Sequence, residues 1–80
     1  LASDQDNALV FADGPAADAT RERLVPWAAR VNDALDACGL ARCRGDIMAG
    51  NREWCLPAAA WRERFADWMR TPDPAALLNA

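Results

Sequence analysis

A short apolar run at residues 8–12 lies between acidic residues and a turn, and it constrains the fold more than any other part of the chain. The run contains Val10 and Phe11, which favour strands, and Asp13-Gly14-Pro15 behind it is typical of a turn. An unbroken apolar run bounded by such residues predicts a short buried strand over 7–12.

Helical spacing follows this turn. Apolar residues recur at intervals of three and four from about residue 16 to residue 38, and Gly39 then suits the C-terminal cap of a helix. Pro26 leaves two interpretations open, a kink in one helix or the first residue of a second helix. The recurring residues, expected on the buried face, are Leu24, Trp27, Ala28, Val31, Leu35 and Cys38.

A second strand is expected over 41–49, with Gly50-Asn51 as the turn after it. Pro57 is then expected to open a second helical segment. Residues 71–74, with two prolines, should stop that helix, and Pro74 should begin another.

Aromatic residues mark one face of the segment after Pro57. Trp61, Phe65 and Trp68 form an i, i+4, i+7 stripe. Such a stripe could stack on bases, but aromatic residues at helical spacing usually form core, and we assign it to the core. Trp54 lies just past a turn and either packs or closes one side of a pocket.

Two carboxylates, Asp4 and Asp6, lie one residue apart at the entry of the first strand. Because strand side chains alternate between faces, both should point the same way and could converge on a hard cation that carries a nucleotide's phosphates. Asp and Asn also crowd turns, where they bond nearby backbone N–H groups, so a structural role is the alternative. Asn7 could likewise support the metal or bond the strand-entry backbone.

Charge narrows the range of partners. The net charge is −3, and all nine basic residues are Arg. A basic surface able to grip a nucleic-acid backbone is therefore not expected. Arg42 and Arg44 alternate along the second expected strand and would share one face, which makes them candidates for binding a nucleotide phosphate or an acidic partner. A solvated strand face is the alternative.

Cysteine and histidine usage excludes other chemistry. Cys38, Cys43 and Cys55 form no Cys-x-x-Cys pair, and without His they suit reduced, packed thiols rather than a zinc site. The lack of His also excludes a Ser-His-Asp or Cys-His nucleophile within these residues. No apolar run is long enough to cross a bilayer and no signal peptide is recognisable, so we expect a cytoplasmic protein with no membrane partner.

Four segments resemble successive blocks of one family of bacterial nucleotidyltransferase-like domains: residues 1–10, which resemble the segment after the family's Gly-Ser signature, and residues 32–40, 43–54 and 61–68. Such domains usually occur in chains with CBS and cyclic-nucleotide-binding domains, and they are related to PII-protein uridylyltransferases. The resemblance implies a mixed α/β (α+β) chain that forms part of the nucleotidyltransferase, or polymerase-beta-like, fold. The implied order is strand, helix, strand, helix.

The resemblance also implies an activity. A signalling protein would transfer a nucleoside monophosphate from a nucleoside triphosphate to an acceptor, with Asp4 and Asp6 holding Mg²⁺ or Mn²⁺. A third carboxylate usually comes from a neighbouring strand, where Asp46 is the one acidic residue, although it could equally be a solvated acid. By analogy with the uridylyltransferases the acceptor would be a protein hydroxyl. The alternative is a regulatory module that binds a nucleotide or a partner domain without turnover.

In the family, a Gly-Ser loop with a nearby Arg precedes the acidic pair and holds the triphosphate through backbone N–H groups and positive charge. We therefore expect residues 1–80 to be one partial domain that is inactive alone. A chain of this size buries only about 60% of the surface that its unfolded form exposes. Its strand edges would have to be covered by other chain or by a second copy, which makes a homo-oligomer an expected state.

Overall fold

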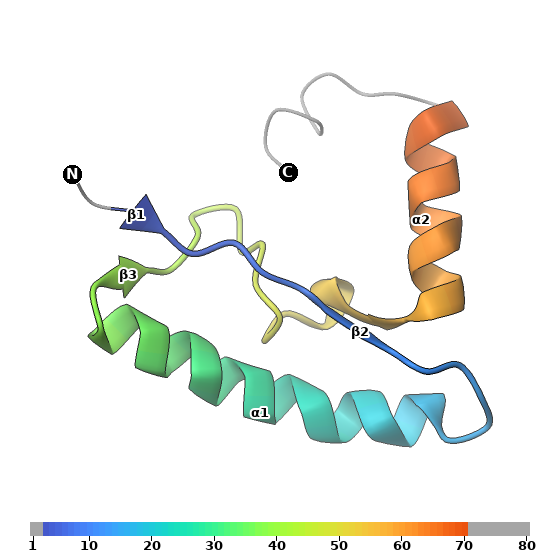
Figure 1. The fold of residues 1–80 in the computed structure, drawn as a ribbon, viewed down its shortest axis with the longest axis horizontal. Coiled ribbons are helices and arrows are strands. Elements are labelled where there is room, and N and C mark those ends of the chain that lie inside the picture. The colour runs from blue at the N-terminus through green and yellow to red at the C-terminus, as the bar shows by residue number, and fades with distance from the viewer. Residues whose placement is uncertain (1–2, 71–80) are drawn as a thin grey trace.

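The computed structural model describes residues 3–70 and shows a mixed α/β fold, as the sequence predicts (Figure 1). Its elements in chain order are β1 (Ser3–Asp4), β2 (Leu9–Phe11), α1 (Ala17–Ala37), β3 (Leu40–Ala41), a 3-10 segment η1 (Arg52–Trp54), β4 (Cys55–Pro57) and α2 (Ala58–Arg70). The expected helix stop at 71–74 and the helix from Pro74 lie outside the described residues. Neither described helix is both long and apolar enough to cross a membrane.

Two short parallel pairings join the strands. β1 pairs with β3, so that Asp4 lies opposite Ala41, and β2 pairs with β4, so that Leu9 lies opposite Cys55. Figure 1 shows β1 and β2 along one extended segment that passes beside both partners. The short stretch from Asp4 to Leu9 therefore faces a much longer one, from Ala41 to Cys55.

The prediction of a strand over residues 41–49 is wrong. β3 ends at Ala41, and the chain then turns, with the Asp46 N–H bonded to the Cys43 carbonyl at 3.0 Å. Asp46 has a φ of 58°, a left-handed conformation that no strand residue adopts. The second pairing instead uses β4, whose three residues just before α2 carry too little pattern to be recognised in the sequence.

The first strand is confirmed, but it is shorter and less buried than expected. β2 covers Leu9–Phe11, and the Val10 side chain between them is 63% exposed. Side chains alternate along a strand, and a narrow sheet covers one face better than the other. Val10 therefore lies on the uncovered face.

α1 is one continuous helix of 21 residues that passes through Pro26, so the hypothesis of a second helix is wrong. Pro26 cannot donate to the carbonyl of Glu22, but both residues are exposed and water can bond that carbonyl instead. The predicted cap is confirmed: Gly39 has a φ of 100°, and its N–H donates to the Asp36 carbonyl at 3.0 Å.

The buried face of α1 is narrower than the sequence predicts. Ala28 and Asn32 are each 2% exposed, whereas Trp27 is 50% and Val31 37% exposed. Gly50 approaches α1 so closely that a Cβ on it would lie 2.8 Å from the Cα of Ala29. Small side chains and a buried amide, rather than large apolar residues, form this contact.

α2 packs against the ends of β4 and β2. Trp61 is buried, and its Nε1 donates to the Leu9 carbonyl at 2.9 Å, which confirms the core prediction for this residue. Phe65 is 55% exposed, so the same prediction is wrong there. β2 and β4, the strands that α2 contacts, are three residues long each, which is too short to cover a stripe of three aromatic residues.

Candidate functional site

The site predicted from the sequence lies along residues 4–7. Asp4 and Asp6 are exposed, whereas Gln5 between them is buried and Asn7 is half-buried. The N–H of Gln5 donates to the Ala41 carbonyl at 2.9 Å, and that of Asn7 donates to the Ile47 carbonyl at 3.1 Å. This alternation leaves both carboxylates on the outer side of the segment.

Three amide side chains, Gln5, Asn7 and Asn32, form a hydrogen-bonded network behind the acidic pair. The Nδ2 of Asn32 donates to Gln5 Oε1 at 2.8 Å and to Asn7 Oδ1 at 3.0 Å. The Nδ2 of Asn7 also donates to Gln5 Oε1, at 3.1 Å. The Nε2 of Gln5 donates to the backbone carbonyls of Asn32, at 2.9 Å, and Leu40, at 3.0 Å.

The same network holds the loop that follows β3. The Ala49 N–H donates to Asn7 Oδ1 at 2.7 Å, and the Gly50 N–H donates to Asn32 Oδ1 at 2.9 Å. Every polar atom of the three amides therefore has a partner, which is the condition under which a buried polar network makes a structure rigid. Of the two roles considered for Asn7, its contacts fit a structural one, but the backbone group that its side chain bonds belongs to Ala49 in the loop and not to the strand entry.

The sequence reasoning missed Gln5 and Asn32. Asn32 stands four residues after Ala28 on the buried face of α1, and this polar residue at a core position was the signal that could have revealed it. Gln5 carries a weaker signal, its place between two aspartates at a strand entry.

Asp46 lies in a turn of the loop rather than on a strand. Its side chain is exposed, and its backbone carbonyl accepts a hydrogen bond from Asn51 Nδ2 at 3.0 Å. The backbone carbonyl of the next residue, Ile47, accepts a hydrogen bond from the Asn7 N–H. The turn is therefore bonded to the residue that directly follows Asp6. Within residues 3–70, no three His, Cys, Asp or Glu side chains lie close enough together to hold a metal ion.

Arg42 and Arg44 do not share a strand face, because β3 ends before them. Arg42 forms an ion pair with Asp33, and its Nε lies 4.0 Å from Asp36 Oδ2. This cation lies beside the C-terminal turn of α1, where positive charge is favourable. Arg44 is exposed and forms no ion pair in the described part of the chain, which leaves its charge available.

The cysteines differ in their surroundings. Cys55 is fully buried, and burial raises the pKa of its thiol, which stays protonated and unreactive at neutral pH. It is the packed thiol that the sequence predicts. Cys38 is exposed, so the prediction is wrong for it, because the C-terminal end of α1 turns this position outward.

A second group of side chains surrounds α2. The ring centroid of Trp54 lies 5.8 Å from the ring centroid of Trp61 and 6.3 Å from that of Trp68. The Arg64 guanidinium lies 5.5 Å from the Trp61 ring centroid and also donates to the Glu53 carbonyl. Trp54 therefore packs, and Arg64 fastens η1 to α2.

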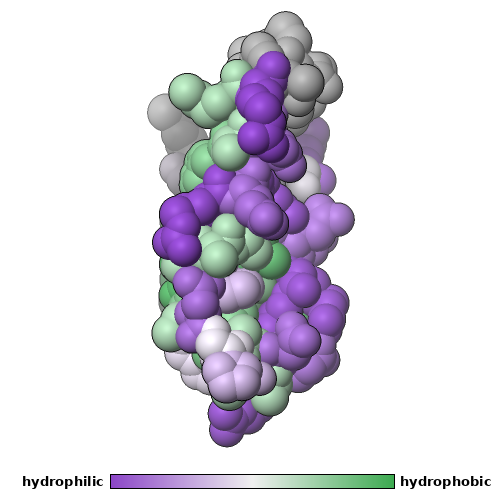
Figure 2. All heavy atoms as spheres, turned by 90° about the vertical axis from the view of Figure 1, so that its right-hand side faces the viewer, coloured by the Kyte–Doolittle hydropathy of each residue, from purple (hydrophilic) through white to green (hydrophobic). Residues whose placement is uncertain are grey.

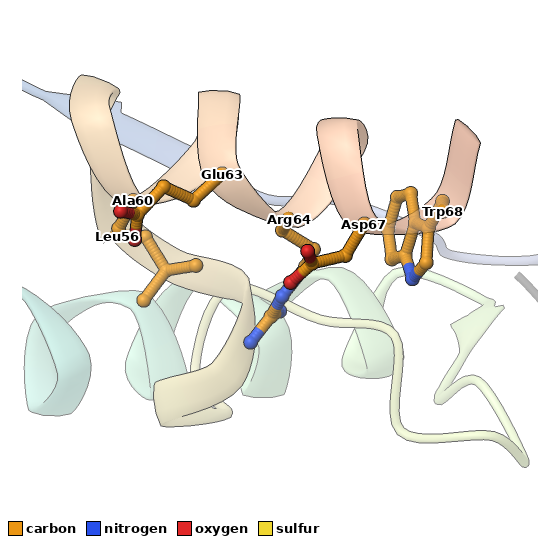
Figure 3. Close-up of a pocket in the computed structure, with 6 residues that line it drawn as sticks. All are labelled: Leu56, Ala60, Glu63, Arg64, Asp67 and Trp68. Atoms are coloured by element: carbon orange, nitrogen blue, oxygen red, sulfur yellow. The ribbon is translucent and has the colours of Figure 1, made fainter. Parts of the chain in front are cut away.

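A hollow of about 390 Å³ lies beside this cluster, lined by Leu56, Ala60, Glu63, Arg64, Asp67 and Trp68 (Figure 3). Arg64 is already bonded to backbone, and two acidic side chains share the lining, so the hollow is poorly suited to phosphate. β1 and α2 lie at opposite ends of the molecule in Figure 1, which separates the hollow from Asp4.

A comparison with models of known protein families finds a match. The family model described as "Putative nucleotidyltransferase DUF294" matches residues 1–75. The chain belongs to this family. No curated protein and no solved structure matches it. The match spans every described element and confirms the resemblance as far as a nucleotidyltransferase-like domain. The fused domains, the bacterial origin and the relation to PII uridylyltransferases stay predictions.

Proposed function

We propose that this protein is a metal-dependent nucleotidyltransferase in which Asp4 and Asp6 hold Mg²⁺ or Mn²⁺ together with a nucleoside triphosphate. One observation carries the proposal: two exposed carboxylates flank a buried amide at the entry of the parallel strands, in a chain of nucleotidyltransferase-like sequence. The pair is open to solvent and to a ligand, while the residues behind it are fixed.

The donor set fits a hard cation. Carboxylate oxygens are the ligands that Mg²⁺ prefers, and Mg²⁺ commonly binds through one or two protein carboxylates, with phosphate oxygens and waters completing its shell. Two carboxylates therefore suffice, and Asp46 as a third ligand stays a prediction. When bound, the cation would neutralise phosphate charge and polarise the phosphoryl group.

The remaining roles follow from charge and exposure. Arg44 is the better of the two predicted phosphate contacts, because Arg42 is already paired with Asp33. A protein hydroxyl is the proposed acceptor, and a signalling chain with CBS or cyclic-nucleotide-binding domains is the proposed setting. Both rest on the relation between families rather than on a contact in this molecule.

Calorimetric titration of the intact protein with a nucleoside triphosphate and Mg²⁺ tests the site. We expect Asp4→Asn and Asp6→Asn each to weaken metal-dependent binding by about tenfold or more, because each removes a charged metal ligand. Glu63→Gln, an acid on α2 at the other end of the molecule, is the control and should bind as the unaltered protein does. Unchanged binding in both aspartate variants would refute the site.

A transfer assay separates the enzyme from a binding module. With radiolabelled nucleoside triphosphate, the intact protein should label an acceptor or release pyrophosphate, and the Asp6→Asn variant should not. Metal-dependent binding without any transfer would support the regulatory alternative.

A further inference from the structure

Asp6 lies in a gap of the strand pairing. The two parallel pairings stop at Asp4, opposite Ala41, and resume at Leu9, opposite Cys55. Asp6 itself belongs to no strand. Its direction therefore depends on what holds its two neighbours, Gln5 and Asn7, rather than on a regular ladder.

Asn32 holds both neighbours from α1. One nitrogen, Asn32 Nδ2, donates to Gln5 Oε1 at 2.8 Å and to Asn7 Oδ1 at 3.0 Å. The residue is 2% exposed, so water cannot replace these bonds without opening the core. No other described side chain bonds the side chains on both sides of Asp6.

We infer that Asn32 is a positioning residue for the metal site, fixing the separation and direction of the Asp4 and Asp6 carboxylates through Gln5 and Asn7. This inference rests on the proposed function. Mg²⁺ demands near-ideal geometry at short metal–oxygen distances, so a ligand with a loosened backbone binds it less well. Groups that orient metal ligands typically alter metal affinity by about ten- to a hundredfold when mutated.

The test is Mn²⁺ titration of the intact protein, followed by electron paramagnetic resonance of the free ion. Asn32→Asp keeps the size of the side chain and the acceptor for the Gly50 N–H but removes both donated bonds. We expect Mn²⁺ affinity to fall by about tenfold although both carboxylate ligands remain. If Asn32→Asp does not fold, we expect the same loss from Asn32→Ala, which introduces a strong helix former and adds no charge.

A matched control separates positioning from stability. Ala28 lies on the same buried face of α1, is also 2% exposed and makes no side-chain hydrogen bond. The substitution Ala28→Gly should therefore lower stability without removing a bond of the amide network. Variants are compared by melting temperature first. At a similar loss of melting temperature, the control should keep its Mn²⁺ affinity, and an equal loss of affinity in the control would overturn the inference.

The pH dependence gives a readout that a purely structural role would not move. Burial raises the pKa of a carboxyl group, so the carboxyl introduced by Asn32→Asp should take up a proton in mildly acidic solution. It could then donate again to Gln5 or Asn7, and the deficit in Mn²⁺ affinity relative to unaltered protein at the same pH should narrow. A deficit that is constant across pH would count against positioning.

The outcomes distinguish this inference from the proposed function. Loss of Mn²⁺ binding in Asp6→Asn with full affinity in folded Asn32→Asp or Asn32→Ala would overturn the inference and leave the metal site standing. No Mn²⁺ binding by the unaltered protein would overturn both.

Discussion

At the scale of single residues, a buried asparagine on a helix is tolerated only if its hydrogen bonds are complete. An unpaired buried amide costs about 1–3 kcal/mol, and Asn32 avoids this cost because both its nitrogen and its oxygen have partners. The sequence could not reveal this arrangement, because Gln5 lies 27 positions away from Asn32. The sequence did predict that Asp4 and Asp6 point to the same side, which depends only on local alternation.

Asp46 allows a prediction at this scale. Its φ of 58° is tolerated by Asp and Asn but not by β-branched residues, so Asp46→Val should lower the free energy of unfolding by about 1–2 kcal/mol. Asp46→Asn keeps the turn and should melt as the unaltered protein does, while a third-ligand role would weaken its Mn²⁺ affinity. Thermal melting and Mn²⁺ titration of both variants measure this. Normal affinity in Asp46→Asn would assign the residue to the turn alone.

At the scale of secondary-structure elements, the sequence predicted the features that depend on neighbouring residues and missed those that depend on distant ones. Gly39 and the spacing of apolar residues before it predicted the end of α1, because the hydrogen bonds of a helix join residues that are close in sequence. β3 and β4 are two and three residues long and exist through pairing with a segment far back in the chain. The position of such short strands depends on the tertiary structure.

The aromatic stripe of α2 gives an element-scale prediction. Trp61 is buried and bonds the Leu9 carbonyl, so Trp61→Ala should lower the free energy of unfolding by about 3–5 kcal/mol. Phe65→Ala should lower it by much less, because more than half of that side chain is already exposed. Chemical denaturation of both variants measures the difference. Equal losses would mean that Phe65 is covered in solution.

At the scale of the whole molecule, apolar surface is left open. The Cα atoms extend over 37 × 33 × 12 Å, so the molecule is thin. Figure 2, seen from the side of α2, shows hydrophobic residues in a band between hydrophilic areas. Phe65 and Met69 on α2 are 55% and 84% exposed. Apolar residues exposed together promote association of protein molecules.

We therefore expect the chain of 80 residues, expressed alone, to associate in solution, and Met69→Lys to reduce that association. The Met69 side chain is so exposed that the substitution should change stability by no more than about 0.5 kcal/mol. Ala34→Lys adds the same charge at an exposed site on α1 and serves as the control. Light scattering against concentration measures the effect. If the unaltered chain is a monomer at all concentrations, the exposed apolar surface does not drive association.

The amide network also has a consequence for hydrogen exchange. The N–H groups of Ala49 and Gly50 are bonded to side chains, Asn7 Oδ1 and Asn32 Oδ1, instead of to backbone carbonyls. Their protection from solvent deuterium therefore follows the opening of these side chains and not the breaking of a strand or a helix. The exchange rates of two consecutive loop amides thus report whether the interior next to Asp6 is intact.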